Sequence, residues 1–273
     1  MDAREFLKNK KRVVIKIGTS SLSYDSGRLN FQHIENLAYV LSALRQRGLD
    51  ILLVSSGAIG VGASRIGMVK RPEDLHIKQA LAAIGQAELI KIYQRFFEEY
   101  NQIVAQVLLT KDVVTKPLRH EKAKNPLEKL LSMNIIPIIN ENDTISTYEI
   151  EFGDNDTLSA LVATLVNADL LILLSDIDGL YSADPKTVPS AHIIPTVEKI
   201  TPELEKLAAG SGNVFGTGGM VTKISAAKMC YDANIDTVIT NGSDPSVIFD
   251  ILEGKNVGTH FVTNNVYSEK NES

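Results

Sequence analysis

Three polar side chains crowd the start of one predicted helix. The segment Gly153-Asp154-Asn155-Asp156 runs into apolar residues at helical spacing, so the helix begins near Asp156. A single acidic side chain at such a position is explained as a helix cap, because the first backbone N–H groups of a helix lack partners. Capping accounts for one of the three polar residues. The others indicate a loop that places charge and hydrogen-bonding groups for a ligand.

Two lysines supply the opposite charge. Lys16 stands inside the apolar run 13–17, where a buried ammonium group is unfavourable unless it has a partner. The alternative is that Lys16 reaches solvent from the end of its strand. Lys223 follows the glycine-rich turn 216–219 at the start of another predicted helix. A phosphate group would use both positive charges, and Asp156 would orient the two ammonium groups.

Two common nucleotide-binding motifs are absent from the sequence. The segment 216–223 ends in Thr222-Lys223, whereas a P-loop requires glycine before its lysine. No first strand leads into a GxGxxG segment. A phosphate site in this chain is therefore built differently, from the two lysines together with the backbone N–H groups of Gly18, Gly218 and Gly219.

The positions of these residues follow from the alternation of strands and helices. Short apolar, often β-branched runs alternate with amphipathic helical patterns such as the one that Asn30 caps. This alternation predicts an α/β protein, a three-layer αβα sandwich with a mostly parallel central sheet. Polar or glycine-rich turns follow the strands that end near Ile17, Val54, Ile139, Leu174 and Thr240. Ligands bind beyond the carboxyl ends of parallel strands, so these turns should share one site.

Composition limits the classes of function and the domain organisation. The 273 residues carry a formal net charge of −5, which argues against a general binder of nucleic acid or of membrane surfaces. With 44% hydrophobic residues the chain can form a full core. We expect a single domain over residues 1–262, followed by a polar, flexible tail at 263–273.

The sequence also indicates a compartment. Residues 1–12 lack the apolar segment of a signal peptide, and no run approaches the roughly 20 apolar residues of a membrane helix. The one cysteine, Cys230, lies in a helical pattern, so we assign it to the core, and an internal disulfide is excluded. We therefore expect a cytoplasmic protein.

Five motifs, in order along nearly the whole chain, resemble those of the amino acid kinase family. They are Val14-Ile15-Lys16-Ile17-Gly18-Thr19-Ser20, Val54-Ser55-Ser56-Gly57-Ala58-Ile59, Ile139-Asn140-Glu141-Asn142-Asp143, Gly153-Asp154-Asn155-Asp156 and Thr217-Gly218-Gly219-Met220-Val221-Thr222-Lys223. The third and fourth motifs resemble the members that phosphorylate glutamate. Many of these members carry a C-terminal PUA domain, and the length of this chain leads us to expect a form without it.

The resemblance implies ATP-dependent phosphorylation of the side-chain carboxylate of L-glutamate to L-glutamyl 5-phosphate, the first step of proline biosynthesis. A carboxylate with an unperturbed pKa of about 4.3 is ionised at neutral pH, so this nucleophile needs no general base. The transfer then requires alignment and neutralisation of charge. The family further implies Mg²⁺ that bridges the phosphates of ATP, with no metal site built from protein side chains. It also implies feedback inhibition by L-proline and a homo-oligomer, either a dimer or a tetramer.

The same resemblance implies roles for individual residues. Lys16 and Lys223 should hold the β- and γ-phosphates, and Asp156 should fix both lysines, so these three are the catalytic residues. Glutamate should bind to Ser56, Asn155 and Asp143, the last as the partner of the α-ammonium group. The residues expected to bind the nucleotide are Lys16, Gly18, Ser175, Asp176, Thr217, Gly218, Gly219, Met220, Val221, Thr222 and Lys223. Those expected to support the site from behind are Asn140 and Asp154.

Two alternatives are compatible with the sequence. A related kinase of the same family would act on N-acetylglutamate, aspartate or carbamate. A non-catalytic module that senses an amino acid belongs to a different class of protein. Simple binding of glutamate does not require both Lys16 and Lys223, so this pair argues against the sensing module.

Overall fold

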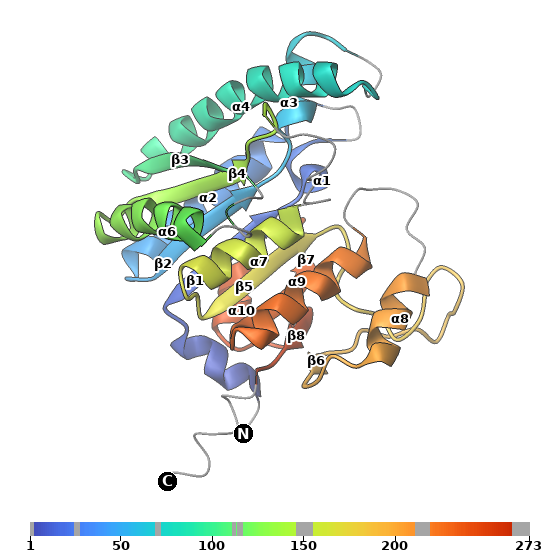
Figure 1. Ribbon diagram of the computed structural model, residues 1–273. Helices are drawn as coiled ribbons and strands as arrows, with labels where there is room; N and C mark the ends of the chain where they lie inside the picture. The colour runs from blue at the N-terminus through green and yellow to red at the C-terminus, as the bar shows by residue number, and fades with distance from the viewer. Residues whose placement is uncertain are drawn as a thin grey trace.

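The computed structural model describes residues 3–24, 28–68, 72–110, 113, 117–145, 155–210 and 219–263. In this part of the chain an eight-stranded sheet lies between layers of helices, with strand order β3-β4-β2-β1-β5-β7-β8-β6 (Figure 1). The paired strands run parallel except for β7 and β8. The three-layer αβα architecture predicted from the alternation of strands and helices is confirmed.

Strands and helices alternate along the chain. The strands are β1 (Arg12–Ile17), β2 (Asp50–Ser55), β3 (Val104–Leu109), β4 (Ile136–Glu141), β5 (Leu170–Ser175), β6 (Thr196–Val197), β7 (Asp236–Asn241) and β8 (Thr259–Phe261). The helices are the 3-10 helix η1 (Ala3–Asn9) and the α-helices α1 (Thr19–Leu22), α2 (Phe31–Gln46), α3 (Ala58–Arg65), α4 (Leu75–Glu98), α6 (Pro117–Ser132), α7 (Asn155–Leu165), α8 (Pro202–Gly210), α9 (Met220–Asp232) and α10 (Val247–Leu252). Asn30 caps α2 as predicted, because its side chain accepts a hydrogen bond from the backbone N–H of His33 at 3.1 Å.

The central strand β1 is buried on both faces, and this decides where Lys16 points. Val14 packs in the core that includes α7 and α9, whereas Val13 and Ile15 pack in the core that includes α2. Side chains alternate between the two faces of a strand, so Lys16 lies on the same face as Val14. The lysine therefore faces α7 and α9. Cys230 is buried in the same core, as predicted.

The parallel strand order brings five carboxyl ends to one edge of the sheet. β1 pairs with β2 on one side and with β5 on the other, and β4 and β7 flank these three strands. The turns after the five strands therefore share one edge, as the sequence predicted.

The helices α3 and α4 pack backbone against backbone at two glycines. A Cβ atom on Gly85 would lie 1.7 Å from the carbonyl oxygen of Ala58, and one on Gly62 would lie 2.0 Å from that of Leu81. Only glycine allows so close an approach. The contact holds the start of α3, and with it the preceding turn Ser56-Gly57, against the long helix α4 at the upper end of Figure 1.

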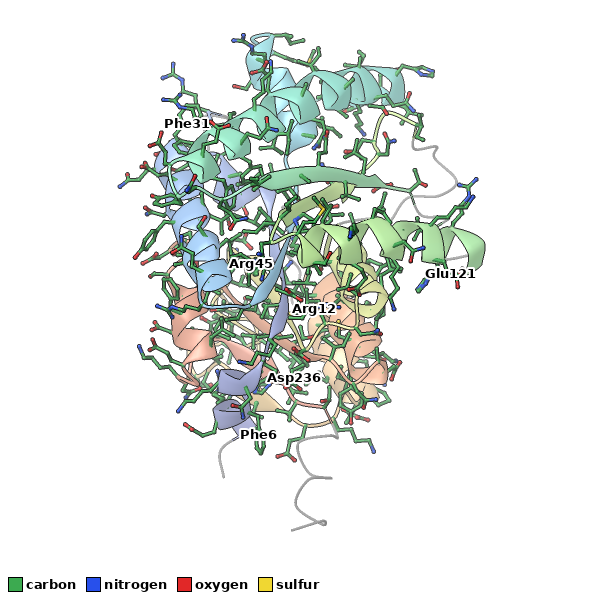
Figure 2. The ribbon with its side chains drawn as sticks, turned by 90° about the vertical axis from the view of Figure 1, so that its left-hand side faces the viewer. Phe6, Arg12, Phe31, Arg45, Glu121 and Asp236 are labelled. Carbon is green, nitrogen blue, oxygen red and sulfur yellow. The ribbon has the colours of Figure 1, made fainter. Side chains whose placement is uncertain are left out.

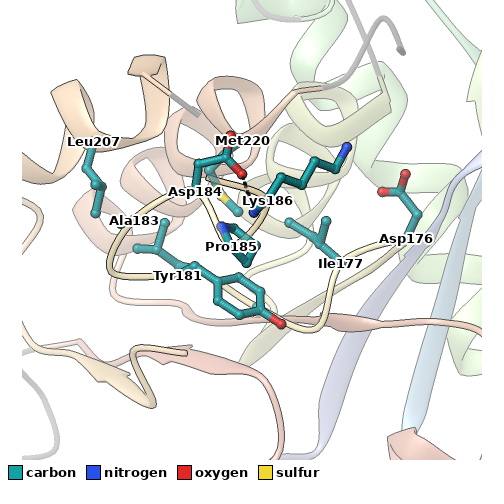
Figure 3. Close-up of a pocket in the computed structure, with 11 residues that line it drawn as sticks. Asp176, Ile177, Tyr181, Ala183, Asp184, Pro185, Lys186, Leu207 and Met220 are labelled. Carbon is teal, nitrogen blue, oxygen red and sulfur yellow. Dashed lines mark hydrogen bonds between the residues drawn. The ribbon is translucent and has the colours of Figure 1, made fainter. Parts of the chain in front are cut away.

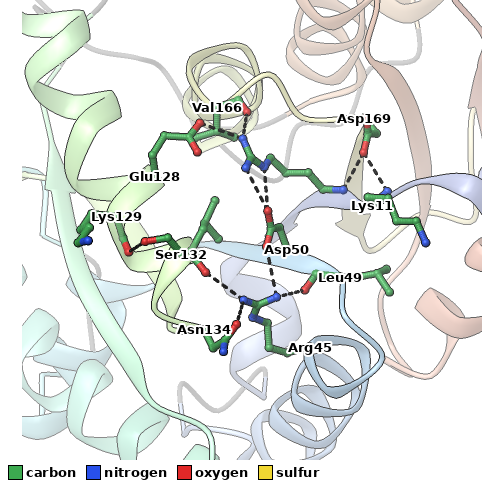
Figure 4. Close-up of polar contacts among 12 residues, drawn as sticks. Lys11, Arg45, Leu49, Asp50, Glu128, Lys129, Ser132, Asn134, Val166 and Asp169 are labelled. Atoms are coloured by element: carbon green, nitrogen blue, oxygen red, sulfur yellow. Dashed lines mark hydrogen bonds and ion pairs between the residues drawn. The ribbon is translucent and has the colours of Figure 1, made fainter.

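A network of charged side chains lies at the opposite edge, where β1 and β2 begin (Figure 4). Arg12 donates to Asp50 at 3.0 Å and to Glu128 at 2.9 Å. Arg45 also donates to Asp50, at 3.2 Å, so one carboxylate joins two arginines. Figure 2 labels both arginines, whose side chains are 24% exposed for Arg12 and 9% exposed for Arg45. The network ties α2 and α6 to the sheet at the edge away from the predicted site.

The last described residue packs against the sheet. Thr263 is 2% exposed, and its backbone N–H donates to Asp236 at 2.9 Å. The tail expected over residues 263–273 stays a prediction, because residues 264–273 lie outside the described part of the chain. The assignment of residues 1–262 to a single domain stays a prediction. None of the described helices is long and apolar enough to cross a membrane.

Candidate active site

A carboxylate lies between two lysines at the carboxyl edge of the sheet. Lys16 Nζ is 2.6 Å from Asp156 Oδ1, and Lys223 Nζ is 3.0 Å from Asp156 Oδ2. The hydroxyl of Thr222 also donates to Asp156 Oδ2, at 3.0 Å. The structure thus brings together four side chains from three elements, β1, α7 and α9, that are far apart in the sequence.

All three charged side chains are buried. Asp156 is 0% exposed, Lys16 is 6% exposed and Lys223 is 4% exposed. Burial alone would raise the pKa of Asp156, but the ammonium groups of Lys16 and Lys223 outweigh this and hold the pKa below its usual value. Two positive charges and one negative charge leave the cluster with an excess of positive charge. The cluster therefore favours an anion beside it.

Two helices begin next to the cluster. Asp156 lies in the first turn of α7, and Gly219 precedes α9, in which Lys223 is the fourth residue. The first backbone N–H groups of a helix have no partner within the helix, and they carry partial positive charge. The site therefore combines two ammonium groups with helix N-termini, an arrangement that suits phosphate.

Three side-chain amides and a serine form a polar network beside the cluster. Asn155 Nδ2 lies 2.9 Å from Ser56 Oγ, 3.0 Å from Asn140 Oδ1 and 3.1 Å from the backbone oxygen of Ser55. Asn140 Nδ2 donates to Gln86 Oε1 at 2.8 Å. The network joins the ends of β2 and β4 to α7 and α4. Because Asn155 immediately precedes the carboxylate of the lysine cluster, the two groups of residues are contiguous.

Asp143 lies in the turn after β4 and is half-buried. Burial, together with the nearby charge of Glu141, raises the pKa of Asp143 to about 6. A cationic partner would stabilise the ionised form of this carboxyl group. The turn therefore offers a place for an ammonium group.

A pocket of about 210 Å³ opens beyond the end of β5 (Figure 3). Ser175, the last residue of β5, donates to Asp176 in the pocket wall at 3.1 Å. Met220, also in the wall, is the first residue of α9, so the pocket and Lys223 are about one helical turn apart. The pocket therefore adjoins the lysine cluster. Its lining residues are Asp176, Ile177, Gly179, Leu180, Tyr181, Ala183, Asp184, Pro185, Lys186, Leu207 and Met220.

Most of the site residues predicted from the sequence lie at this edge. Gly18 follows β1, and a Cβ atom placed on it would be 3.7 Å from Lys16 Nζ. Val221 is 49% exposed and lines neither the cluster nor the pocket. Three further predicted residues, Asp154, Thr217 and Gly218, lie outside the described part of the chain.

Gln86 and the apolar wall of the pocket are not among the site residues predicted from the sequence. Gln86 lies on the buried face of α4, among apolar residues such as Leu89. A polar residue on an otherwise apolar helical face was a signal that could have identified it. No comparable signal marked Ile177 and Leu180 in the loop after β5 or Leu207 in α8, because an apolar residue has the same appearance in the sequence whether it packs in a core or lines a pocket.

Comparison with known proteins gives a consistent result. Residues 11–241 match the amino acid kinase family. A glutamate 5-kinase of Listeria innocua is 54% identical over 264 residues, which cover 95% of this chain and 96% of that protein. A glutamate 5-kinase of Clostridium perfringens is 50% identical over 263 residues, which cover 95% of this chain and 98% of that protein. The UMP kinase of Bacillus anthracis shares the fold, with a TM-score of 0.64 at 20% identity, over 93% of this chain and 97% of that chain.

Proposed function

Since this chain belongs to the amino acid kinase family, we propose that it transfers the γ-phosphoryl group of ATP to the side-chain carboxylate of L-glutamate, the reaction of a glutamate 5-kinase. The product is L-glutamyl 5-phosphate, and the reaction is the first step of proline biosynthesis. The observation that carries the proposal is the buried cluster of Lys16, Asp156 and Lys223, which adjoins both a pocket and an amide network.

The two lysines bind the β- and γ-phosphates and stabilise the charge that spreads over the transferring group. Asp156 keeps the two ammonium groups together, because two buried like charges repel each other without a carboxylate between them. The backbone N–H groups at the start of α9 add hydrogen-bond donors. Since the attacking carboxylate is already ionised at neutral pH, the site needs no general base, and it acts through alignment and neutralisation of charge.

Glutamate binds at the amide network. The oxygen of Ser56 accepts the hydrogen bond from Asn155, so the hydroxyl proton of Ser56 is available to a carboxylate of the substrate. Asp143 pairs with the α-ammonium group. Asn155 is next to Asp156 in the chain, and the side-chain carboxylate of glutamate thereby reaches the phosphates held by the lysines.

The nucleotide base occupies the pocket of Figure 3, where Ile177, Leu180 and Met220 offer an apolar surface to a flat ring.

Mg²⁺ is part of the MgATP co-substrate and neutralises phosphate charge. Both oxygens of Asp156 face ammonium groups, at 2.6 and 3.0 Å, which suits a carboxylate that holds lysines. Among the described residues, no group of three or more His, Cys, Asp or Glu side chains is placed to hold a metal.

We further propose a cytoplasmic location, a homo-oligomeric assembly (dimer or tetramer) and feedback inhibition by L-proline. Proline carries an α-carboxylate and a cationic α-nitrogen like those of glutamate, so it can compete for Asp143. Cell fractionation, light scattering and a proline titration of the activity test these three proposals separately.

An assay of ADP release with ATP, Mg²⁺ and L-glutamate tests the proposed reaction. The same assay with N-acetylglutamate, aspartate and carbamate tests the choice of acceptor. We expect the highest kcat/KM with L-glutamate, and hydroxylamine should trap the acyl phosphate as γ-glutamyl hydroxamate. A higher kcat/KM with N-acetylglutamate would overturn the choice of acceptor. Binding of glutamate without ADP release would indicate the sensing module.

A further inference from the structure

Gln86 of α4 belongs to the amide network but has no role in the proposed reaction so far. Its side chain is 9% exposed, and its Oε1 accepts the 2.8 Å hydrogen bond from Asn140 Nδ2. We propose that Gln86 is a positioning residue. Through Asn140 it fixes the orientation of Asn155, so that the carbonyl oxygen of Asn155 faces the α-ammonium group of glutamate. This inference rests on the proposed function and adds a determinant of its substrate specificity.

A backbone donor sets the direction of the hydrogen bonds at one end of the network. The backbone N–H of Glu141 donates to Asn140 Oδ1 at 2.9 Å. An N–H group can only donate, so the oxygen of the Asn140 amide must lie on that side and its Nδ2 on the other. Asn140 is 3% exposed, and its Nδ2 therefore needs an acceptor within the protein. Gln86 Oε1 is that acceptor.

A backbone acceptor sets the direction at the other end. The backbone oxygen of Ser55 can only accept, and Asn155 Nδ2 lies 3.1 Å from it and 3.0 Å from Asn140 Oδ1. A rotated Asn155 amide would bring its own oxygen against these two oxygen atoms. Asn155 Oδ1 therefore faces out of the network, and no described residue donates a hydrogen bond to it.

An outward carbonyl oxygen suits a cation that carries several N–H donors. The α-ammonium group of a free amino acid has three such donors, and Asp143, three residues after Asn140 in the chain, is the acceptor proposed above for the same group. An acylated nitrogen has a single N–H and no charge, so it satisfies neither acceptor fully. The chain of amides that starts at Gln86 thus favours a free amino acid over an N-acyl derivative.

Loss of the acceptor at position 86 should propagate along the network. Asn140 Nδ2 would then be a buried donor without a partner, which is unfavourable. Rotation of the Asn140 amide would relieve this, but it would present a donor to Asn155 Nδ2, which is also a donor. Asn155 would keep its contacts with Ser55 and Ser56 but lose the acceptor at Asn140, so its amide would be held less firmly and its oxygen would bind the ammonium group more weakly.

The substitution Gln86→Met keeps the length of the side chain and removes the acceptor. We expect the KM for glutamate to rise about tenfold, as for a lost hydrogen bond to a charged group. The KM for ATP should stay within about twofold, and so should the inhibition constant of glutarate, which has both carboxylates but no ammonium group. The matched control is Leu89→Ala, because Leu89 is buried on the same helix and lies outside the network. Leu89→Ala should lower stability, but it should not change the KM for glutamate relative to the inhibition constant of glutarate.

A double-mutant cycle distinguishes positioning from a general structural effect. If Gln86 acts through Asn140, Gln86→Met should add nothing to the glutamate KM of Asn140→Ala. The inference would be overturned if the increases in glutamate KM caused by the two single substitutions multiply in the double variant. It would also be overturned if the inhibition constant of glutarate rises together with the KM for glutamate. If Gln86→Met does not fold, Gln86→Asn can replace it, because the shorter side chain withdraws the acceptor by one methylene. This variant should likewise raise the KM for glutamate and leave the inhibition constant of glutarate unchanged. A wild-type protein that fails to phosphorylate glutamate refutes the proposed function, whereas an active wild type with an unaffected Gln86→Met refutes this inference alone.

Discussion

Lys223 and Asp156 are 67 positions apart in the chain, yet Lys223 Nζ donates to Asp156 Oδ2 at 3.0 Å in the protein interior. Lys223 is the fourth residue of α9 and Asp156 is the second residue of α7. These two helices contribute to one core and lie side by side in Figure 1. The contact therefore holds together the two helix starts at which we propose that the phosphates of ATP bind.

Replacing Lys223 should remove transition-state stabilisation. For Lys223→Ala we expect kcat to fall by about a hundredfold or more, with a smaller change in the KM for glutamate, because the ammonium group acts on the transferring phosphoryl group. Steady-state kinetics with varied glutamate measure both quantities. Lys228→Ala is the matched control, since Lys228 lies on the same helix with its side chain 53% exposed. Equal activity in the two variants would contradict the assignment.

Asp156→Asn should leave two buried ammonium groups without their counter-charge. We expect the free energy of unfolding at neutral pH to fall by about 3–5 kcal/mol, as when one partner of a buried ion pair is removed. The lowered pKa of Asp156 means that its stabilising contribution is complete above the unfolded value of about 3.9 and is lost as pH falls through the folded value.

MgATP should stabilise Asp156→Asn more than it stabilises the wild type, because phosphate replaces the lost negative charge. Melting curves with and without MgATP measure this difference. If MgATP raised the melting temperature of both proteins by the same amount, this would argue that the phosphates do not reach the lysines.

Glutamate binding should depend on pH through Asp143, whose pKa is raised to about 6. In the proposed complex the substrate ammonium pairs with the ionised carboxyl group, so the KM for glutamate should be constant well above pH 6 and should rise as pH falls through that value. At one pH unit below the pKa the rise is about tenfold. Asp143→Asn should have a high KM at every pH. A wild-type rise that persists in this variant would assign the titration to another group.

Ionisation of Asp143 should lower the stability of the unliganded protein, although it favours the binding of glutamate. A carboxyl group whose pKa is raised on folding lowers stability once it ionises, so its unfavourable contribution grows as pH rises from the unfolded value of about 3.9 to the folded value. Asp143→Asn should therefore be more stable than the wild type at pH 7 in the absence of substrate. Denaturant unfolding at pH 4 and pH 7 measures this difference.

The glycine contact between α3 and α4 should be sensitive to a single methyl group. Gly85→Ala places a Cβ atom where it would lie 1.7 Å from the carbonyl oxygen of Ala58, so the helices must separate. We expect a loss of about 1–3 kcal/mol of stability and a higher KM for glutamate, because the turn with Ser56 moves with α3. Gly60→Ala is the control for stability. Its Cβ atom would lie 3.8 Å from the Thr19 side chain, an ordinary contact, so denaturant unfolding should show no comparable loss.

The charged network at the opposite edge should affect stability alone. Asp50→Ala leaves Arg12 and Arg45 without the carboxylate that joins them. We expect a loss of about 1–2 kcal/mol, since the group is partly exposed, with kcat and both KM values nearly unchanged. Chemical denaturation and steady-state kinetics measure the two effects. A changed KM for glutamate would show that the two edges of the sheet are coupled.

Several features were predictable because they depend on local spacing. The alternation of apolar runs and helical patterns led to the αβα fold, and the cap at Asn30 followed from a single side chain before an amphipathic helix. The need of Lys16 for a partner followed from its place in an otherwise apolar run, residues 13–17. The cap and each strand or helix were read from residues within a few positions of one another, and the Lys16 inference added the unfavourable free energy of burying an unpaired charge.

The partners themselves required the tertiary structure. Lys16 meets Asp156 because β1 lies beside β5 and its even-numbered side chains face α7 and α9. Gln86 reaches Asn140 across 54 positions because two glycines bring α3 and α4 together, and nothing in the spacing of α4 specifies that contact.

The sequence alone determined which side chains could not be buried without a partner, because the free energy of desolvating a charge or an amide belongs to the residue itself. Strand order, the alternation of faces along β1 and the approach of α4 decided which groups became those partners, because these contacts form only when segments distant in the chain pack against one another.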